Sequence, residues 1–182
     1  VETVSVTSWR VTGETTATIT INPAGTLASD TGYYINIPSG TFADAAGNPY
    51  VGISDTTTLN FTTGDTSAPT LVSSTPADGA TGVAVGTNIT LVFTEDVYRA
   101  DGNITIHDNT NGAIAATIPA TSGRVTTEGA TATIDPAGEL GSDKDYSVTI
   151  DSGAFADQAG NPYAGITNTT TVIFTTADVT PP

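Results

Sequence analysis

The stretch that decides the fold is Ala154-Phe155-Ala156-Asp157-Gln158-Ala159-Gly160-Asn161-Pro162-Tyr163, because the chain contains it twice. The other copy is Thr41-Phe42-Ala43-Asp44-Ala45-Ala46-Gly47-Asn48-Pro49-Tyr50, which lies 113 residues earlier, as Asp44 and Asp157 show. The flanking sequence repeats at the same spacing, so that Phe61-Thr62-Thr63 returns as Phe174-Thr175-Thr176. A period close to the size of one small domain indicates a section of a longer tandem array.

The repeat divides the chain into unequal parts. Residues 65–177 form one complete unit, residues 1–64 match only its second half, and residues 178–182 match the start of another linker. Pro69 restricts its own backbone and that of Ala68, so the linker before the complete unit is short and stiff. A half unit exposes sheet edges and cannot close a core alone. We therefore expect either that its first half was removed or that another chain supplies the missing strands.

Short segments of alternating apolar and polar residues predict β-strands. Turn residues separate these segments, and no sustained helical period is present, although Gly153–Asp157 has room for one helical turn. Seven strands are expected in the complete unit, at Leu71–Ser74, Asn88–Phe93, Asn103–His107, Ile114–Ile118, Ala130–Ile134, Tyr146–Ile150 and Thr170–Thr175. The half unit is expected to have strands at Val1–Val6, Thr16–Ile21, Tyr33–Ile37 and Thr57–Thr62. This pattern predicts an all-β fold of antiparallel, immunoglobulin-like sandwiches.

Tyr146 is placed near the start of a predicted strand, shortly after the corner at Leu140, and Tyr33 repeats this placement after Leu27. In immunoglobulin-like sandwiches a tyrosine at this point donates to or accepts from the backbone across the corner. The alternative is that both are ordinary half-buried aromatic residues, and the sequence leaves both interpretations open.

The charge balance is strongly acidic, with 19 acidic and 4 basic residues and a net charge of −15. Such a surface repels nucleic acid and anionic membranes, whereas divalent cations are suitable partners because they take oxygen ligands. The simpler interpretation is that the charge keeps the protein soluble. The absence of cysteine excludes disulfides, thiol catalysis and zinc–thiolate sites. With one histidine and no segment apolar for long enough to span a membrane, we expect neither an enzyme nor membrane insertion.

Two runs of sequence carry a family resemblance. Ala68-Pro69-Thr70-Leu71-Val72, followed by Thr75-Pro76-Ala77-Asp78-Gly79 and Ile89-Thr90-Leu91-Val92-Phe93-Thr94-Glu95, resembles the opening of the bacterial Ig-like repeat of S-layer proteins and large RTX-type adhesins. Phe155-Ala156-Asp157, Ala159-Gly160-Asn161 and Phe174-Thr175-Thr176 resemble its close. The resemblance covers nearly the full chain. It implies a non-catalytic spacer or surface component, extracellular or on the bacterial cell surface, with calcium often bound between units.

The acidic loops contain candidate Ca²⁺ ligands. Calcium takes six to eight oxygens from carboxylates, amides and backbone carbonyls, so an Asp-rich loop with glycine is chemically suited to it. The alternative is that these residues only shape a turn, because Asp and Asn bond their own backbone and glycine supplies a positive φ. The candidate ligands are Asp65, Asp157 and Asn161 first, Glu95 and Asp96 second, and Asp44 and Asn48 in the loop of the first copy.

The sequence leaves three functions open. The first is a spacer module whose partners are the neighbouring repeats, stiffened by Ca²⁺ at the junctions. The second is an S-layer or filament component that assembles with other copies by strand complementation at open sheet edges. The third is a carbohydrate-binding accessory module of a secreted enzyme, in which Trp9, Tyr33 and Tyr34 form a stacking platform instead of packing in the fold.

Overall fold

The computed structural model describes residues 2–13, 15–136, 138 and 140–181. The chain folds into two compact units, Val1–Thr66 and Ser67–Pro182, which we call unit 1 and unit 2. The boundary lies in the predicted linker, and Pro69 is buried at the start of unit 2. No helix among the described residues is long and apolar enough to cross a membrane.

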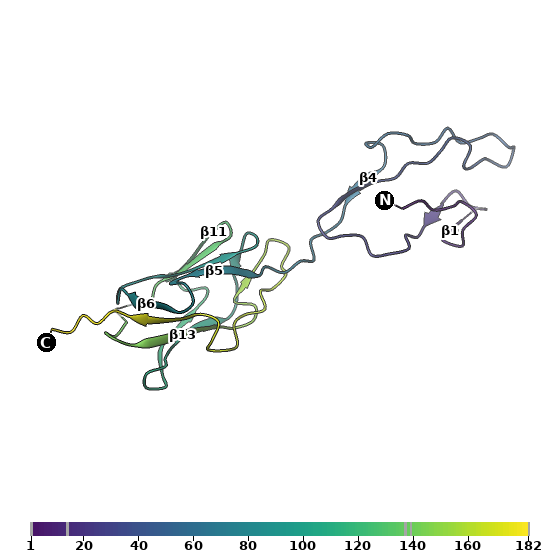
Figure 1. The fold of residues 1–182 in the computed structure, drawn as a ribbon. Helices are drawn as coiled ribbons and strands as arrows, with labels where there is room; N and C mark the ends of the chain where they lie inside the picture. The colour runs from purple at the N-terminus through teal and green to yellow at the C-terminus, as the bar shows by residue number, and fades with distance from the viewer. Residues whose placement is uncertain (1, 14, 137, 139, 182) are drawn as a thin grey trace. The chain divides into compact units, whose positions relative to one another are not determined.

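Unit 2 is a β-sandwich made of two main sheets (Figure 1). Strand pairing is antiparallel throughout these sheets except between β15 and β6, which are parallel. The five-stranded sheet has the order β10 (Ala113–Pro119), β9 (Asn103–Asp108), β13 (Asp145–Ile150), β15 (Ile173–Thr176) and β6 (Ala80–Val83). The four-stranded sheet has the order β11 (Val125–Glu128), β12 (Thr131–Ile134), β7 (Ile89–Phe93) and β5 (Leu71–Thr75). A small sheet pairs β8 (Tyr98–Arg99) with β14 (Phe155–Ala156).

Alternation along the strands builds the core of unit 2. The apolar residues of β7 and β9 are buried at every second position, while their neighbours are only partly buried, as a pleated strand requires when one face is packed. The ring of Phe93, at the end of β7, lies 5.5 Å from that of Phe155 and 5.1 Å from that of Tyr163. Phe93 therefore connects the first half of the repeat to the loop stretch that repeats in the sequence.

The predicted strands of the complete unit are confirmed, with bounds that differ by at most a few residues. The sequence did not predict β6, β8, β11 and β14. β6 lies in a region rich in turn residues. β8 and β14 are only two residues long each, which is too short for an alternation of apolar and polar residues to be detected. The helical turn considered for Gly153–Asp157 is wrong, because Phe155 and Ala156 form β14 and pair with β8.

Of the strands expected in unit 1, only those whose partner strands also lie in unit 1 are formed. β1 (Val11–Thr12) pairs with β2 (Thr20–Ile21), and β3 (Gly32–Tyr34) pairs with β4 (Asn60–Thr62). The registers match those of unit 2 at the 113-residue spacing, since Tyr33 faces Phe61 as Tyr146 faces Phe174. Each second half thus folds in the same local way.

Two expectations for unit 1 are wrong for one reason. Residues 2–6 form no strand, and Val1 lies outside the described residues; β3 ends at Tyr34 instead of reaching Ile37. In unit 2 the equivalent segments are β10 and the end of β13, and both pair with β9. Because residues 1–64 contain no counterpart of β9, these segments lack that partner strand, and Ile37 keeps only an isolated bridge to Ile53. The predicted strands Thr16–Ile21 and Thr57–Thr62 shorten to β2 and β4.

The tyrosine at the corner plays its expected role in both units. The hydroxyl of Tyr146 accepts a hydrogen bond of 2.8 Å from the backbone N–H of Gly141, and the hydroxyl of Tyr33 accepts one of 2.8 Å from Ala28. The tyrosine corner is therefore confirmed, and it forms even where the rest of the sandwich is missing.

Candidate metal centre

The repeated loop is a side-chain-capped turn in both units. In unit 2, Asp157 Oδ1 accepts a hydrogen bond of 2.8 Å from the backbone N–H of Asn161, and its Oδ2 accepts one of 2.7 Å from Nδ2 of the same residue. Asp44 and Asn48 make the same pair of bonds, both at 2.8 Å, in unit 1. Gly160 and its counterpart have positive φ values of 90° and 87°. These are the contacts that we expect if Asp157 and Asn161 shape the turn.

The carboxyl of Asp157 is buried, whereas that of Asp44 is exposed. Burial raises the pKa of Asp157, but hydrogen bonds from the side chain and backbone of Asn161, and from Gly160 and Ala159, outweigh it and hold the pKa below the ordinary value. For Asp44, hydrogen bonds from the side chain and backbone of Asn48 lower the pKa. Both carboxyls are therefore ionised at neutral pH.

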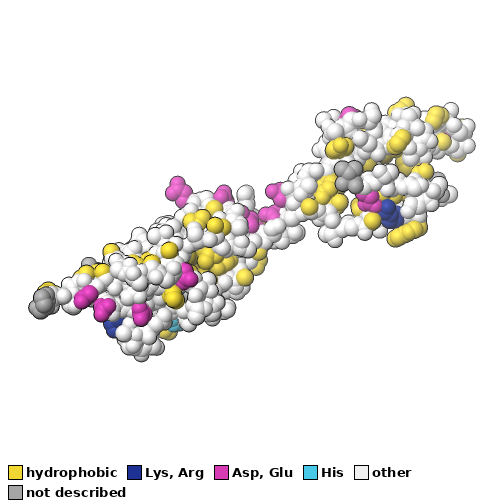
Figure 2. Space-filling view, in the orientation of Figure 1, with side chains coloured by type: hydrophobic (Ala, Val, Ile, Leu, Met, Phe, Trp, Pro, Cys, Tyr) yellow, Lys and Arg dark blue, Asp and Glu magenta, His cyan; other side chains and the backbone are white. Residues whose placement is uncertain are grey.

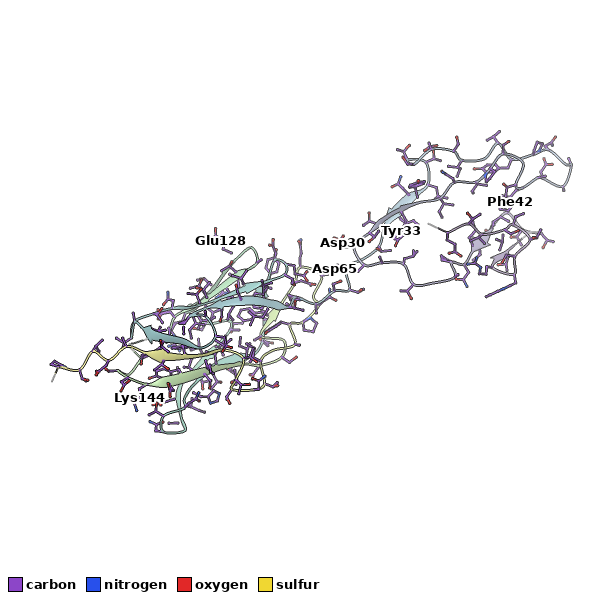
Figure 3. All side chains as sticks on the ribbon, viewed as in Figure 1. Asp30, Tyr33, Phe42, Asp65, Glu128 and Lys144 are labelled. Carbon is purple, nitrogen blue, oxygen red and sulfur yellow. The ribbon has the colours of Figure 1, made fainter. Side chains whose placement is uncertain are left out.

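Two of the predicted ligands lie in neighbouring loops of unit 2. Glu95 follows the end of β7 and Asp157 follows β14, and one carboxylate oxygen of each lies within 4.8 Å of one of the other. Asp65 (Figure 3) lies at the end of unit 1, in the predicted linker. Like charges at this spacing repel one another, and a divalent cation would offset that repulsion. Each carboxylate oxygen has two lone pairs, so the turn bonds of Asp157 leave acceptor capacity for a cation.

The other predicted ligands have different positions. Asp96, next to Glu95, is exposed and is not grouped with Glu95 and Asp157; its Oδ1 lies near Gly129. Asn161 holds the turn through its amide. Asp44 and Asn48 form the equivalent turn in unit 1, where no described carboxylate group of three or more gathers.

A serine near each tyrosine corner forms hydrogen bonds with the linker that follows its unit, and the sequence analysis did not predict these contacts. Ser29 Oγ donates a hydrogen bond of 2.9 Å to Asp65 Oδ1 and accepts one of 2.8 Å from the N–H of Thr66. In unit 2, Ser142 Oγ bonds Asp178 Oδ1 at 3.2 Å and accepts from the N–H of Val179 at 2.8 Å. The signal was present, because both pairs keep the spacing of the repeat.

The aromatic residues of unit 1 do not gather into one platform. Tyr33 stacks on Phe61, with ring centroids 5.7 Å apart, and its hydroxyl serves the corner. Trp9 is exposed, and no ring contact is recorded for it among the described residues. Packing within the fold therefore accounts for Tyr33.

We expect the two turn carboxyls to respond differently to loss of their asparagine. Carbon-detected NMR titration of the wild type should show Asp157 and Asp44 both titrating below the ordinary aspartate value of about 3.9. In Asn161→Ala the pKa of Asp157 should rise by more than that of Asp44 does in Asn48→Ala, because burial opposes ionisation of Asp157 while only the side-chain donor is lost. In Asn48→Ala the pKa of exposed Asp44 should return toward the ordinary value. Equal responses would contradict the assignment of burial as the difference.

The sign of the pH dependence follows from these depressed pKa values. The free energy that ionised Asp157 contributes to folding is fully present above the unfolded pKa, and it is lost as the pH falls through the lower folded pKa.

A comparison with models of protein families supports the fold. The family model described as "Bacterial Ig-like domain" matches residues 2–63 and again residues 65–176. A comparison with curated protein sequences gave no match. Among solved structures, CopC from Methylosinus trichosporium OB3b is similar at 19% identity and a TM-score of 0.45, over 63% of this chain and 98% of that one.

Two structures of a bacterial S-layer protein are also similar. The N-terminal part of SbsC matches at 21% identity and a TM-score of 0.42, over 64% of this chain and 25% of that one. The structure of rSbsC(31-844) matches at 21% identity and a TM-score of 0.41, over 64% and 14% of the two chains. This chain therefore spans a quarter or less of the S-layer protein chains that it resembles.

Proposed function

Because this chain belongs to the bacterial Ig-like domain family, we propose that it is a non-catalytic spacer module of a repeat protein on the bacterial cell surface. The observation that carries this proposal is the exact recurrence of strand register, tyrosine corner and capped turn at one spacing along the chain. Tandem units of this kind extend a chain by stacking one domain after the next. Its partners are then the neighbouring repeats.

The chemistry of the described side chains also favours a structural role. A nucleophile with a positioned base is the usual mark of covalent catalysis. The one histidine, His107, lies on β9 with its Nε2 2.9 Å from the hydroxyl of Thr149, in the middle of a sheet. Asp143 lies in the turn before β13, and Asp145 is the first residue of that strand. Asp145 Oδ1 accepts a 2.6 Å hydrogen bond from the hydroxyl of Thr175. Both arrangements serve the sandwich.

The second part of the proposal is a Ca²⁺ ion held by Asp65, Glu95 and Asp157. Glu95 and Asp157, from neighbouring loops of unit 2, provide hard, anionic oxygens of the kind that calcium prefers, and backbone carbonyls and water would complete its coordination. Asp65 is included because it is the carboxylate that the sequence places in the linker. An ion at this point would tie the linker to those loops and reduce its freedom, which is the property that a spacer requires.

Calcium should raise the melting temperature of the metal-stripped protein. At a Ca²⁺ concentration about 100 times the dissociation constant we expect a rise of roughly 5–10 °C. Glu95→Gln should abolish most of this rise, because it removes one charged ligand and leaves the Asp157 turn intact. The measurement is a thermal melt followed by circular dichroism, paired with calorimetric titration of Ca²⁺.

Two variants serve as matched controls. Asp96→Asn removes the same charge from the adjacent residue, which lies outside the group, and should keep the calcium response. Asp178→Asn changes the residue equivalent to Asp65, which makes the same serine contact but belongs to no group of three or more described acidic residues, and it should also keep the calcium response. If calcium produces neither heat nor a shift in the wild type, the ion is not part of the function, and the three carboxylates only shape loops.

A further inference from the structure

A small polar hollow lies beside the short strand β8 of unit 2. It has a volume of about 290 Å³ and is lined by Tyr98, Arg99, Thr121 and Thr127. Tyr98 and Arg99 form β8, Thr127 belongs to β11, and Thr121 lies in the turn that connects β10 to β11. Ligand pockets in proteins have volumes from about 300 Å³ upwards, so this hollow suits a ligand about as large as one sugar ring.

The side chain of Arg99 is held in place by one nitrogen of its guanidinium group. Nη1 donates hydrogen bonds to the backbone carbonyls of Ser122 and Val125, at 2.9 and 2.8 Å. The N–H of Val97 bonds the carbonyl of Gly129 at 3.1 Å, so β8 is anchored next to both ends of β11. Nε and Nη2 carry further N–H donors, and no contact of either is recorded among the described residues. The guanidinium is therefore fixed in position and still has donors for a ligand.

Arg99 also lacks an ion pair with any described residue. The protein has 4 basic and 19 acidic residues, and Figure 2 shows acidic side chains scattered over the visible face with few basic ones among them. Two of the other basic residues pair with carboxylates, Arg10 with Glu2 and Lys144 with Asp108. A positioned arginine without a carboxylate partner is thus a local cationic point on an acidic protein, and an anionic group would be attracted to it.

The other side chains around the hollow also have unused polar groups. No hydrogen bond of the hydroxyls of Tyr98, Thr121 and Thr127 is recorded among the described residues, and the ring of Tyr98 is 50% exposed. The lining contains no described carboxylate. Glu128 (Figure 3) follows Thr127 on β11, but successive side chains of a strand point to opposite faces, so its carboxylate lies on the other face of that strand.

We infer that this hollow binds a carboxylated sugar, a hexuronate residue of an acidic polysaccharide. The planar fork formed by Nε and Nη2 of Arg99 matches a carboxylate, with which it makes two parallel charge-assisted hydrogen bonds. The exposed ring of Tyr98 offers an apolar surface to the C–H face of a pyranose ring. The hydroxyls of Thr121 and Thr127 donate to or accept from the sugar hydroxyls.

This ligand class uses every group in the lining. A neutral sugar would leave the guanidinium without an anionic partner, and a simple carboxylate would leave the ring and the hydroxyls without contacts. Nucleic acid and anionic membranes present dense negative charge, which a net charge of −15 around a single arginine repels. The inference goes beyond the proposed function, because it gives a spacer module a ligand of its own.

The test is an NMR titration of the full chain, labelled with ¹⁵N, against the methyl glycosides of glucuronic and galacturonic acid. A chelator is present throughout, so that calcium cannot bridge acidic groups. Saturable shifts of the amide signals of residues 98–99 and 121–127 are expected with at least one uronoside. The methyl glycosides of glucose and galactose carry CH₂OH in place of the carboxylate and should bind at least tenfold more weakly. Acetate, which lacks the ring, should also bind at least tenfold more weakly.

Variants assign the binding to the lining side chains. Tyr98→Ala removes the exposed ring, and Thr127→Val removes a hydroxyl while keeping the shape of the side chain; each should weaken binding several-fold. Arg99→Lys keeps the charge but loses the planar fork, and it should weaken binding at least fivefold.

Two matched controls should bind the uronoside as the wild type does. Arg124→Gln removes a positive charge two residues after Ser122, from a side chain that does not line the hollow. Tyr34→Ala removes a ring that is 54% exposed in unit 1, close to the exposure of Tyr98.

Several results would overturn the inference. Absence of a saturable shift with both uronosides would remove the site. Equal binding of the uronosides and the neutral glycosides, or of acetate, would show that the hollow does not recognise a carboxylated sugar. An equal loss in Arg124→Gln and Arg99→Lys would show only a general attraction of charge. Because the titration is done in chelator, it succeeds or fails independently of the calcium melts.

Discussion

Phe155→Ala should lower the free energy of unfolding of unit 2 by about 3–5 kcal/mol, the largest effect that we expect from a single substitution. Phe155 is fully buried, and its ring lies 5.5 Å from that of Phe93. Truncation removes apolar burial and leaves a cavity that the surrounding strands cannot fill, because they are fixed by ladder hydrogen bonds. Urea unfolding followed by far-UV circular dichroism measures the change, since unit 2 contributes most of the strand signal.

The repeat supplies a matched control for this substitution. Phe42 occupies the same place in the loop of unit 1, but it is only partly buried and lines an open hollow of the surface. Phe42→Ala should therefore change stability by at most about 1 kcal/mol. If both substitutions cost the same, the difference in burial between the two units does not exist in solution.

Gly165→Ala should destabilise unit 2 more than any other glycine substitution in the repeated loop. Gly165 has a φ of 86°, which alone costs an alanine roughly 1–2 kcal/mol. A Cβ there would also lie 2.5 Å from the carbonyl oxygen of Ile150 and 2.8 Å from the backbone nitrogen of Ser152. These are backbone atoms of a chain held by the Ile150–Ile166 bridge, so they cannot move aside, and the clash should add at least about 1 kcal/mol.

Gly160→Ala separates the two causes. Gly160 has a similar φ of 90°, but no atom lies within 4 Å of the position that its Cβ would take. This variant therefore carries the conformational cost without the clash, and the same urea experiment should rank it clearly above Gly165→Ala in stability. Equal losses would mean that the close approach at residue 165 is absent.

The sequence alone was sufficient for the repeat, for seven of the strands of unit 2 and for the turns. These features depend on local chemistry: alternation between apolar and polar residues, glycine at positive φ, and an Asp–Asn pair that bonds its own backbone. The capped turn at Asp157 and the corner at Tyr146 were both predictable for this reason, because every atom involved lies within a few residues along the chain.

The proximity of Glu95 and Asp157 needed more than a local pattern. Strand direction indicates which loops share an end of the sandwich, and this placed both residues among the candidates. It also placed Asp96 there, and adjacent residues could not be ranked, because the choice between Glu95 and Asp96 depends on which side chain faces Asp157.

What only the tertiary structure decided is how much of unit 1 folds without its first half. The sequence of residues 1–64 carries nearly the same strand and turn signals as residues 114–177, yet residues 2–6 form no strand, and Tyr50 and Phe61 stay exposed where Tyr163 and Phe174 are buried. A β-strand persists only where a partner satisfies its backbone and a second layer covers its face. Those partners are β7 and β9 in unit 2, and no local pattern can replace them.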